Sequence, residues 1–235
     1  MNDFNRSYAP ATGTMDMSKD AGLRSFMLGV YNKMALGLLI TAGIAYAMGA
    51  FVPREIAATI YTGPIGLAIA FGPLALLLIS SFAMRNPSPT GANLLYWSIV
   101  GLIGVGMGAI LIRFAAMPDG MLIIAKAFLT TAIAFGGLSL WGYTTKRDLS
   151  GWGTFLIMGV IGLIVVSLLN MFIFQSPVMH TVISVVGLLL FAGLTAYDTQ
   201  RLKESYFAIM GNARAMSVAT TFGALSLYIN FVNMF

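Results

Sequence analysis

Long apolar segments alternate with short polar ones along almost the whole chain. A helix needs about 20 predominantly apolar residues to cross the hydrocarbon core of a bilayer. The pattern predicts seven such helices, at residues 26–50, 62–84, 91–113, 119–142, 152–174, 177–203 and 213–235. We therefore expect an all-α integral membrane protein with one seven-helix transmembrane domain over residues 23–235.

The connectors between these segments carry residues that end helices. They read Pro53-Arg54-Glu55, Asn86-Pro87-Ser88-Pro89, Met117-Pro118-Asp119-Gly120, Lys146-Arg147-Asp148 and Gln175-Ser176-Pro177. The last of them is very short. Because all connectors are short, we expect only the N-terminal tail and a loop at 199–213 to project from the membrane.

Composition supports a membrane protein. Hydrophobic residues make up 58% of the 235 residues and charged residues only 9%, against roughly 25% charged in a typical soluble domain. The chain has no cysteine, which excludes disulfides, thiolate metal sites and a cysteine nucleophile. Residues 1–22 are polar and mixed in charge and lack the apolar run of a signal peptide. We expect them to form a disordered cytoplasmic tail.

The basic residues predict the orientation, because Lys and Arg accumulate on the cytoplasmic side. If the N-terminus is cytoplasmic, nine lie on that side: Arg6, Lys19, Arg24, Arg85, Lys146, Arg147, Arg201, Lys203 and Arg214. Arg54 and Arg113 lie on the opposite side. The bias predicts a cytoplasmic N-terminus and, with seven spans, a C-terminus outside. Since the charges form no stripe with interleaved aromatics, we expect no nucleic-acid partner.

Ionisable residues inside a membrane are costly and by default mark function. Asp198 follows about twenty apolar residues, near the cytoplasmic third of the sixth span. Arg201 is three residues further on, so the two side chains can pair on one helix face. An interfacial capping or salt-bridging role for Asp198 is the alternative. Arg85 ends the second span, as a positive-inside anchor or as a buried pairing partner.

Other polar residues lie in or near the spans. Lys33 and Lys126 lie a few turns or less inside their spans, from where we expect the side chains to reach outward to the interface. Asn230 and Asn233 are three residues apart in the last span, so we expect them to share a face and bond to a neighbouring helix. His180 is the single histidine, and the sequence around it offers no serine and carboxylate constellation of the kind a catalytic triad needs. We therefore expect no enzyme and no cofactor.

Several stretches carry a family resemblance. Gly193-Leu-Thr-Ala-Tyr-Asp-Thr-Gln-Arg-Leu-Lys203 and Ala224-Leu-Ser-Leu-Tyr-Ile-Asn-Phe-Val-Asn-Met-Phe235 resemble the two closing motifs of the Bax inhibitor-1 family. The segment 127–149 is similar to the family's fourth span and the loop after it, and the opening at 24–38 also fits. The resemblance covers about residues 24–235. The compact chain and short tail resemble bacterial members.

The resemblance implies a seven-helix bundle whose last helix is enclosed by the other six. It also implies a pH-sensitive calcium leak, an association with stress resistance and, in some bacterial members, with a membrane-anchored ATP-dependent protease. In the family's leak model two aspartates, on the sixth and seventh helices, share a proton and contact an arginine that ends the second helix. Asp198 matches the first aspartate and Arg85 the arginine, while Asn230 stands at the position of the second aspartate.

The departure at Asn230 changes the expected chemistry. Two close carboxylates cannot both ionise cheaply, so such a pair senses pH, and Asp198 beside Asn230 lacks this repulsion. The amide can still donate a hydrogen bond to the carboxylate. We expect Arg85, Asp198 and Asn230 to form a polar plug, with weakened pH gating. Calcium affinity at Asp198 should also fall, because Ca²⁺ favours anionic oxygens.

Two functions follow from the sequence. The first is a calcium or cation leak of the bacterial inner membrane. The alternative is a non-transporting membrane adaptor that modulates a membrane-anchored ATP-dependent protease or a stress response, using the tail and the 199–213 loop. An intramembrane hydrolase is disfavoured because the chain lacks cysteine and His180 is isolated.

Overall fold

A computed structural model describes residues 21–83 and 86–235, and helices are the only regular elements in this part of the chain. The elements are α1 (Ala21–Phe51), α2 (Arg54–Tyr61), α3 (Gly63–Ala83), α4 (Pro89–Ala115), α5 (Gly120–Thr144), α6 (Ser150–Leu169), the π-helical turn η2 (Asn170–Phe174), α7 (Pro177–Ile209) and α8 (Ala213–Met234). Seven spans are long and apolar enough to cross a membrane, with α6 and η2 together forming one of them. The seven predicted spans are confirmed. The predicted tail falls almost entirely on residues 1–20, outside the described residues.

Serine and proline residues of the connectors define where α4 and α7 begin. Ser88 and Ser176 each accept a hydrogen bond from the first turn of the helix they precede, with proline next in the chain. This arrangement satisfies an otherwise unpaired backbone N–H and fixes the backbone of the first helical residue. The short break before α7 is held by Asn170, whose Oδ1 accepts from the Ser176 N–H at 3.0 Å. Only residues 175 and 176 separate η2 from α7, and the chain reverses there.

The expected 199–213 loop is wrong. Helix α7 continues to Ile209, and only residues 210–212 separate it from α8. Leu202 and Tyr206, four residues apart, are buried on one face of this extension, and the Tyr206 ring lies 5.7 Å from that of Phe26 in α1. The charged residues between them lie on other faces, so apolar packing extends the helix through a segment rich in charge.

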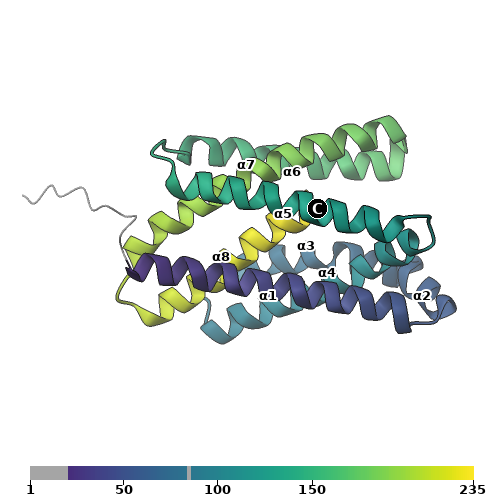
Figure 1. Cartoon of the computed structure of the whole chain (residues 1–235), viewed down its shortest axis with the longest axis horizontal. Coiled ribbons are helices and arrows are strands. Elements are labelled where there is room, and N and C mark those ends of the chain that lie inside the picture. The colour runs from purple at the N-terminus through teal and green to yellow at the C-terminus, as the bar shows by residue number, and fades with distance from the viewer. Residues whose placement is uncertain (1–20, 84–85) are drawn as a thin grey trace, which may run out of the picture.

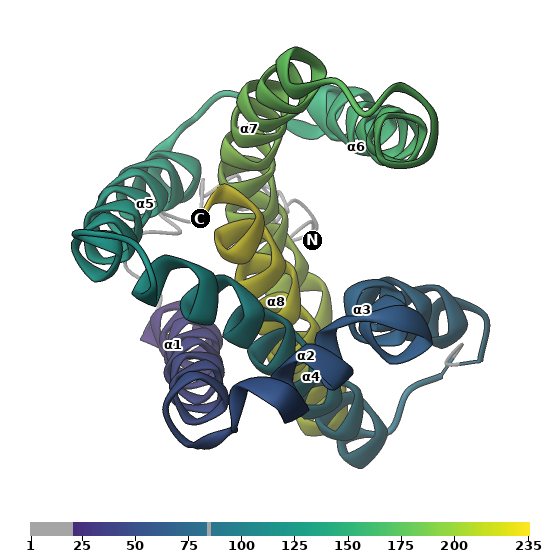
Figure 2. The ribbon, with the colours of Figure 1, turned by 90° about the vertical axis from the view of Figure 1, so that its right-hand side faces the viewer.

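Helix α8 is the most buried of the seven spans. It packs against α1, α4, α5 and α7, whereas α3 packs on α4 and α6 packs on α7. Figure 2 shows α8 running between these helices. In Figure 1 its C-terminal end lies within the outline of the bundle, short of the end at which α2 lies. The enclosure of α8 by all six other spans, and the membrane side of each terminus, stay predictions.

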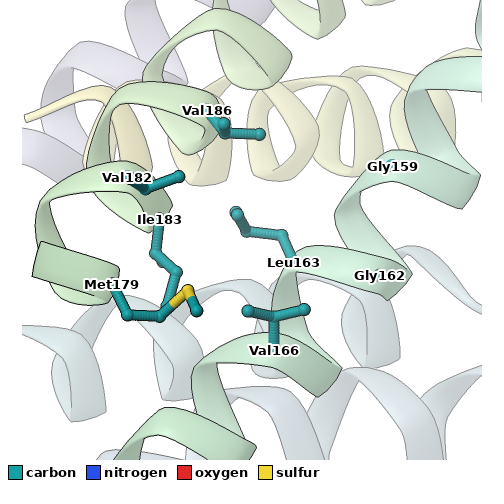
Figure 3. A pocket seen from close by; sticks show the side chains of 8 residues that line it. All are labelled: Gly159, Gly162, Leu163, Val166, Met179, Val182, Ile183 and Val186. Atoms are coloured by element: carbon teal, nitrogen blue, oxygen red, sulfur yellow. The ribbon is translucent and has the colours of Figure 1, made fainter. Parts of the chain in front are cut away.

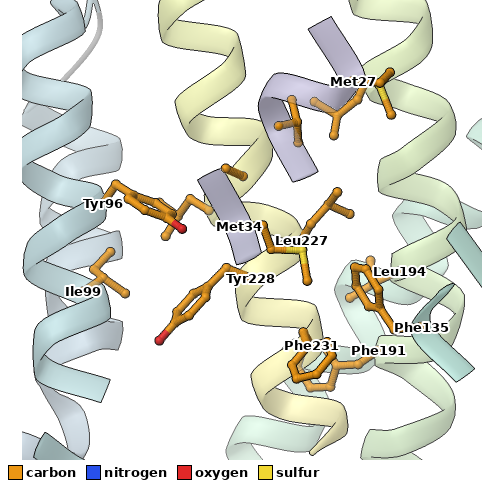
Figure 4. Close-up of a cluster of buried hydrophobic side chains, with 14 of the residues drawn as sticks. Met27, Met34, Tyr96, Ile99, Phe135, Phe191, Leu194, Leu227, Tyr228 and Phe231 are labelled. Atoms are coloured by element: carbon orange, nitrogen blue, oxygen red, sulfur yellow. The ribbon is translucent and has the colours of Figure 1, made fainter. Parts of the chain in front are cut away.

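Aromatic and aliphatic side chains around α8 form the core (Figure 4). Tyr228 of α8 and Tyr96 of α4 are fully buried, with ring centroids 6.1 Å apart. Their hydroxyls are both satisfied: the Tyr228 hydroxyl lies 2.6 Å from Thr41 Oγ1, and Tyr96 donates to the Lys33 carbonyl at 2.7 Å. Further along α8, Phe231 meets Phe135 of α5. The core therefore joins four helices through α8.

Glycines allow close helix contacts at selected points. A Cβ added at Gly104 of α4 would lie 2.9 Å from Ile44 Cβ of α1. At Gly142 of α5 it would lie 2.8 Å from the Cα of Ala196 in α7 and closer still to the Ala196 carbonyl oxygen. The clash at Gly142 is with backbone, which cannot rotate away. Here glycine is required for α5 to touch α7.

We expect Gly142→Ala to destabilise the bundle by about 1–3 kcal/mol, the usual range for an overpacked interior site. Thermal unfolding in detergent, followed by circular dichroism, measures the change. Gly136→Ala is the matched control, because a Cβ at Gly136 meets nothing within 4 Å. Equal melting temperatures for the two variants would contradict the contact.

Candidate functional site

Five consecutive residues of α7, Tyr197 to Arg201, contact different parts of the molecule. Successive helical residues point about 100° apart, so a short run reaches every side of the helix. Tyr197 lies against Gly153 of α6, and Thr199 Oγ1 lies 3.0 Å from Ser139 Oγ of α5. Asp198 faces α8, Gln200 holds the connector before α6, and Arg201 is exposed. Through this run, α7 contacts α5, α6 and α8.

Asp198 is 6% exposed and is held by two donors from α8. Ser226 Oγ donates to Asp198 Oδ2 at 2.6 Å, and Asn230 Nδ2 donates to the same oxygen at 2.8 Å. Ser226 and Asn230 are four residues apart and therefore share a helix face. The structure thus brings Asp198 and Asn230 together, and the amide donates as the sequence suggested. Sequence reasoning missed Ser226, although its spacing from Asn230 was a usable signal.

The structure describes one of the two candidate cationic partners of Asp198, which is Arg201. Arg201 Nη1 lies 3.9 Å from Asp198 Oδ1, and the Arg201 side chain is 57% exposed. An exposed pair of this length contributes about 0–1 kcal/mol. Arg85 lies outside the described residues, so its pairing with Asp198 stays a prediction. Among the described residues, the neutral donors of α8 are the closest partners of Asp198.

Asn233 and His180 do not join this site. Asn233 is exposed, and its Nδ2 donates to the Ile229 carbonyl of its own helix at 2.8 Å. The expectation that it bonds to a neighbouring helix is wrong, because three residues leave it about 60° away from Asn230 around the axis. His180 is exposed near the start of α7.

Lys33 does not reach outward as expected. Its ammonium donates to Asn93 Oδ1 of α4 and, at 2.7 Å, to Thr221 Oγ1 of α8. It also lies 5.6 Å from the centre of the Tyr96 ring. Because α1 packs on both α4 and α8, polar side chains of those helices lie within hydrogen-bond reach of the Lys33 ammonium. Lys126, by contrast, is exposed at the start of α5.

Gln200 holds the connector between α5 and α6. Its Oε1 accepts from the Leu149 N–H and its Nε2 donates to the Arg147 carbonyl, both at 2.8 Å. Lys203, one turn further on, donates to the Tyr143 carbonyl at 2.8 Å. Within the connector, hydrogen bonds from Ser150 keep the pKa of the Asp148 carboxyl below its ordinary value. This end of α7 therefore fixes residues 145–149.

We expect Gln200→Ala to release this connector. The substitution leaves the buried Leu149 N–H without its acceptor, which costs about 1–3 kcal/mol of local stability. Faster trypsin cleavage after Lys146 and Arg147 measures the release. Glu204→Ala, a change at an exposed position of the same helix, is the control. Unchanged cleavage in Gln200→Ala would contradict the role of Gln200.

The described residues contain no group of three His, Asp or Glu side chains that could hold a metal. At the Asp198 site they supply one carboxylate, one hydroxyl and one amide, whereas Ca²⁺ takes six to eight oxygen ligands. A calcium ion at this site would need most of its oxygen ligands from water. The cavity between α6 and α7 is about 320 Å³, and its walls carry only carbon and sulfur side-chain atoms (Figure 3). Its lining side chains provide no oxygen or nitrogen ligand for a cation.

The family described as inhibitor of apoptosis-promoting Bax1 matches residues 23–235, which include both α7 and α8. The chain belongs to the Bax inhibitor-1 family. The resemblance seen in the closing motifs is thereby confirmed.

Relatives of this family member match over nearly their full lengths. An uncharacterized protein of Caulobacter vibrioides is 52% identical, over 100% of this chain and 95% of its own. The inner membrane protein YbhL of Escherichia coli is 39% identical, over 92% of this chain and 89% of its own. Protein RP147 of Rickettsia prowazekii is 35% identical, over 95% and 91%. The Bax inhibitor-1 assignment thus rests on whole-length similarity.

Proposed function

We propose that this protein is a bacterial inner-membrane calcium leak in which Asp198 controls the path. The observation that carries the proposal is a carboxylate 6% exposed inside a membrane-spanning bundle, held by Ser226 and Asn230 of a neighbouring span. Such a residue is expensive in lipid and marks ion or proton pathways. The inner membrane is the location named for the relative YbhL.

The proposed mechanism uses the strength of the contact between α7 and α8. Ionised Asp198 accepts two hydrogen bonds from α8, and charge-assisted bonds are roughly twice as strong as neutral ones. Arg85 would add a third contact, from the end of the second span. Protonation of Asp198 weakens all of these contacts and frees a helix to shift. Because Asn230 is neutral, the repulsion between two carboxylates is missing, and the response to pH in the physiological range is weak.

Calcium influx into liposomes that carry the purified protein tests the proposal. We expect influx above that of protein-free liposomes, with little change between about pH 6 and pH 8, where a pair of carboxylates sharing a proton would titrate. Absence of influx with folded protein would favour the adaptor function, whose candidate partner is a membrane-anchored ATP-dependent protease. The surface for such a partner is smaller than the sequence suggested, because α7 continues to Ile209.

A further inference from the structure

A groove opens between α1 and α5 toward the membrane. It encloses about 550 Å³, a volume typical of ligand sites. It forms because α1 packs mainly on α4 and α8 while α5 packs mainly on α7. The floor holds the buried Met27, Phe135 and Ser139, and the rim holds Leu28 and Leu140, which are 49% and 64% exposed. The groove therefore faces the acyl chains of the lipid.

The walls of the groove suit an acyl chain. Apolar surface dominates the lining, and two of its three hydroxyls, those of Tyr31 and Ser139, bond to each other. Ser139 Oγ in turn lies 3.0 Å from Thr199 Oγ1. A hydrocarbon placed here leaves neither hydroxyl without a partner. A ligand carrying its own polar groups in this part would gain nothing from the floor.

Positive charge surrounds one end of the groove. Arg24 lines this end, and within the described residues no ion pair holds it. Lys203 lies 5.2 Å from the centre of the Tyr143 ring, which also lines the groove. Lys146 and Arg147 follow shortly after Tyr143 in the chain. Against these four cations stand the carboxylates Asp148 and Glu204, so the net charge of this set is positive.

We propose that the groove binds one anionic phospholipid from the leaflet on the side where α1 begins. One acyl chain lies between α1 and α5, and the phosphate lies near Arg24 and Lys203. Basic residues at the ends of spans attract anionic headgroups, by about fivefold in affinity per residue. A zwitterionic phospholipid has the same chains without the net charge. Binding should therefore depend on both the acyl chain and the headgroup charge of the phospholipid.

Native mass spectrometry of the full chain in detergent, with equal phosphatidylglycerol and phosphatidylcholine, tests this site. We expect one tightly bound phosphatidylglycerol. Arg24→Gln should lower the preference for it by about fivefold, while Arg54→Gln, at the start of α2, should leave it unchanged. Gly136→Phe should remove the bound lipid, because residue 136 lines the groove and its Cβ meets nothing within 4 Å. Gly137 is equally open but does not line it, so Gly137→Phe is the matched control.

Each alternative outcome would overturn the proposal. Equal binding of the two phospholipids would contradict the proposed headgroup contact. A lipid that remains bound in Gly136→Phe would show that the lipid site lies outside the groove. Binding of free glycerol phosphate as tight as that of phosphatidylglycerol would assign a phosphate site without an acyl groove. Equal lipid loss in folded Gly136→Phe and Gly137→Phe would contradict a site defined by this groove, because only residue 136 lines it.

Discussion

Asn230→Asp is expected to make calcium flux strongly pH-dependent. Asn230 Nδ2 lies 2.8 Å from Asp198 Oδ2, so the substitution places two carboxylates in contact. Two negative charges about 4 Å apart repel by about 4 kcal/mol at the effective permittivity of a protein site. The pair therefore keeps one shared proton toward neutral pH, and that proton joins α7 to α8. Loss of the proton as pH rises replaces a hydrogen bond with repulsion.

The measurement is the initial rate of calcium influx into liposomes between about pH 6 and pH 8, where the shared proton should be lost. We expect a change of about tenfold across this range in Asn230→Asp, as one proton controls the state, and a much smaller change in the wild type. Asn233→Asp is the matched control, because Asn233 lies on the same helix but is exposed. A flat profile in Asn230→Asp, or an equal slope in Asn233→Asp, would exclude this proton-sharing account.

Asp198→Ala is expected to destabilise the bundle by about 3–5 kcal/mol. The substitution removes the acceptor of the half-buried Ser226 Oγ and of the buried Asn230 Nδ2, and a buried donor without a partner costs about 1–3 kcal/mol. Asp198→Asn keeps an oxygen that accepts from both donors. Its cost should be well below that of alanine, since only the charge is lost.

Thermal unfolding in detergent compares these two variants with the wild type. Asp148→Ala serves as the control for loss of a carboxylate, because Asp148 is exposed and lies in a connector. The expected order of stability is wild type, then Asp198→Asn, then Asp198→Ala. If asparagine and alanine at residue 198 proved equally stable, the hydrogen bonds to α8 would not be what holds this carboxylate.

The spans could be predicted from the sequence, because each apolar segment must be long enough to cross the bilayer. Features that depend on the packing of one helix against another could not be predicted in this way. The short α2 (Arg54–Tyr61) was missed since eight residues are too few for a periodic signal. The end of α7 was misplaced because Arg201, Lys203 and Glu204 suggest a loop, whereas Leu202 and Tyr206 are buried in it.

The candidate site was predicted only in part. Asp198 and Asn230 stood out because polar residues are rare in lipid, and the structure brings them together. Ser226 was overlooked, since a serine in a spanning helix can bond to its own backbone. The partners of Lys33 could not be predicted either, because Asn93 and Thr221 are about 60 and 190 residues away in sequence and only tertiary packing unites them.

The most direct test of the central claim is the initial rate of calcium influx at neutral pH into liposomes carrying equal amounts of wild type or Asp198→Asn. The account predicts influx above protein-free liposomes for the wild type and a several-fold faster rate for Asp198→Asn, because loss of the charge weakens the contact between α7 and α8. A wild-type rate equal to that of protein-free liposomes, or identical rates in the two proteins, would contradict it.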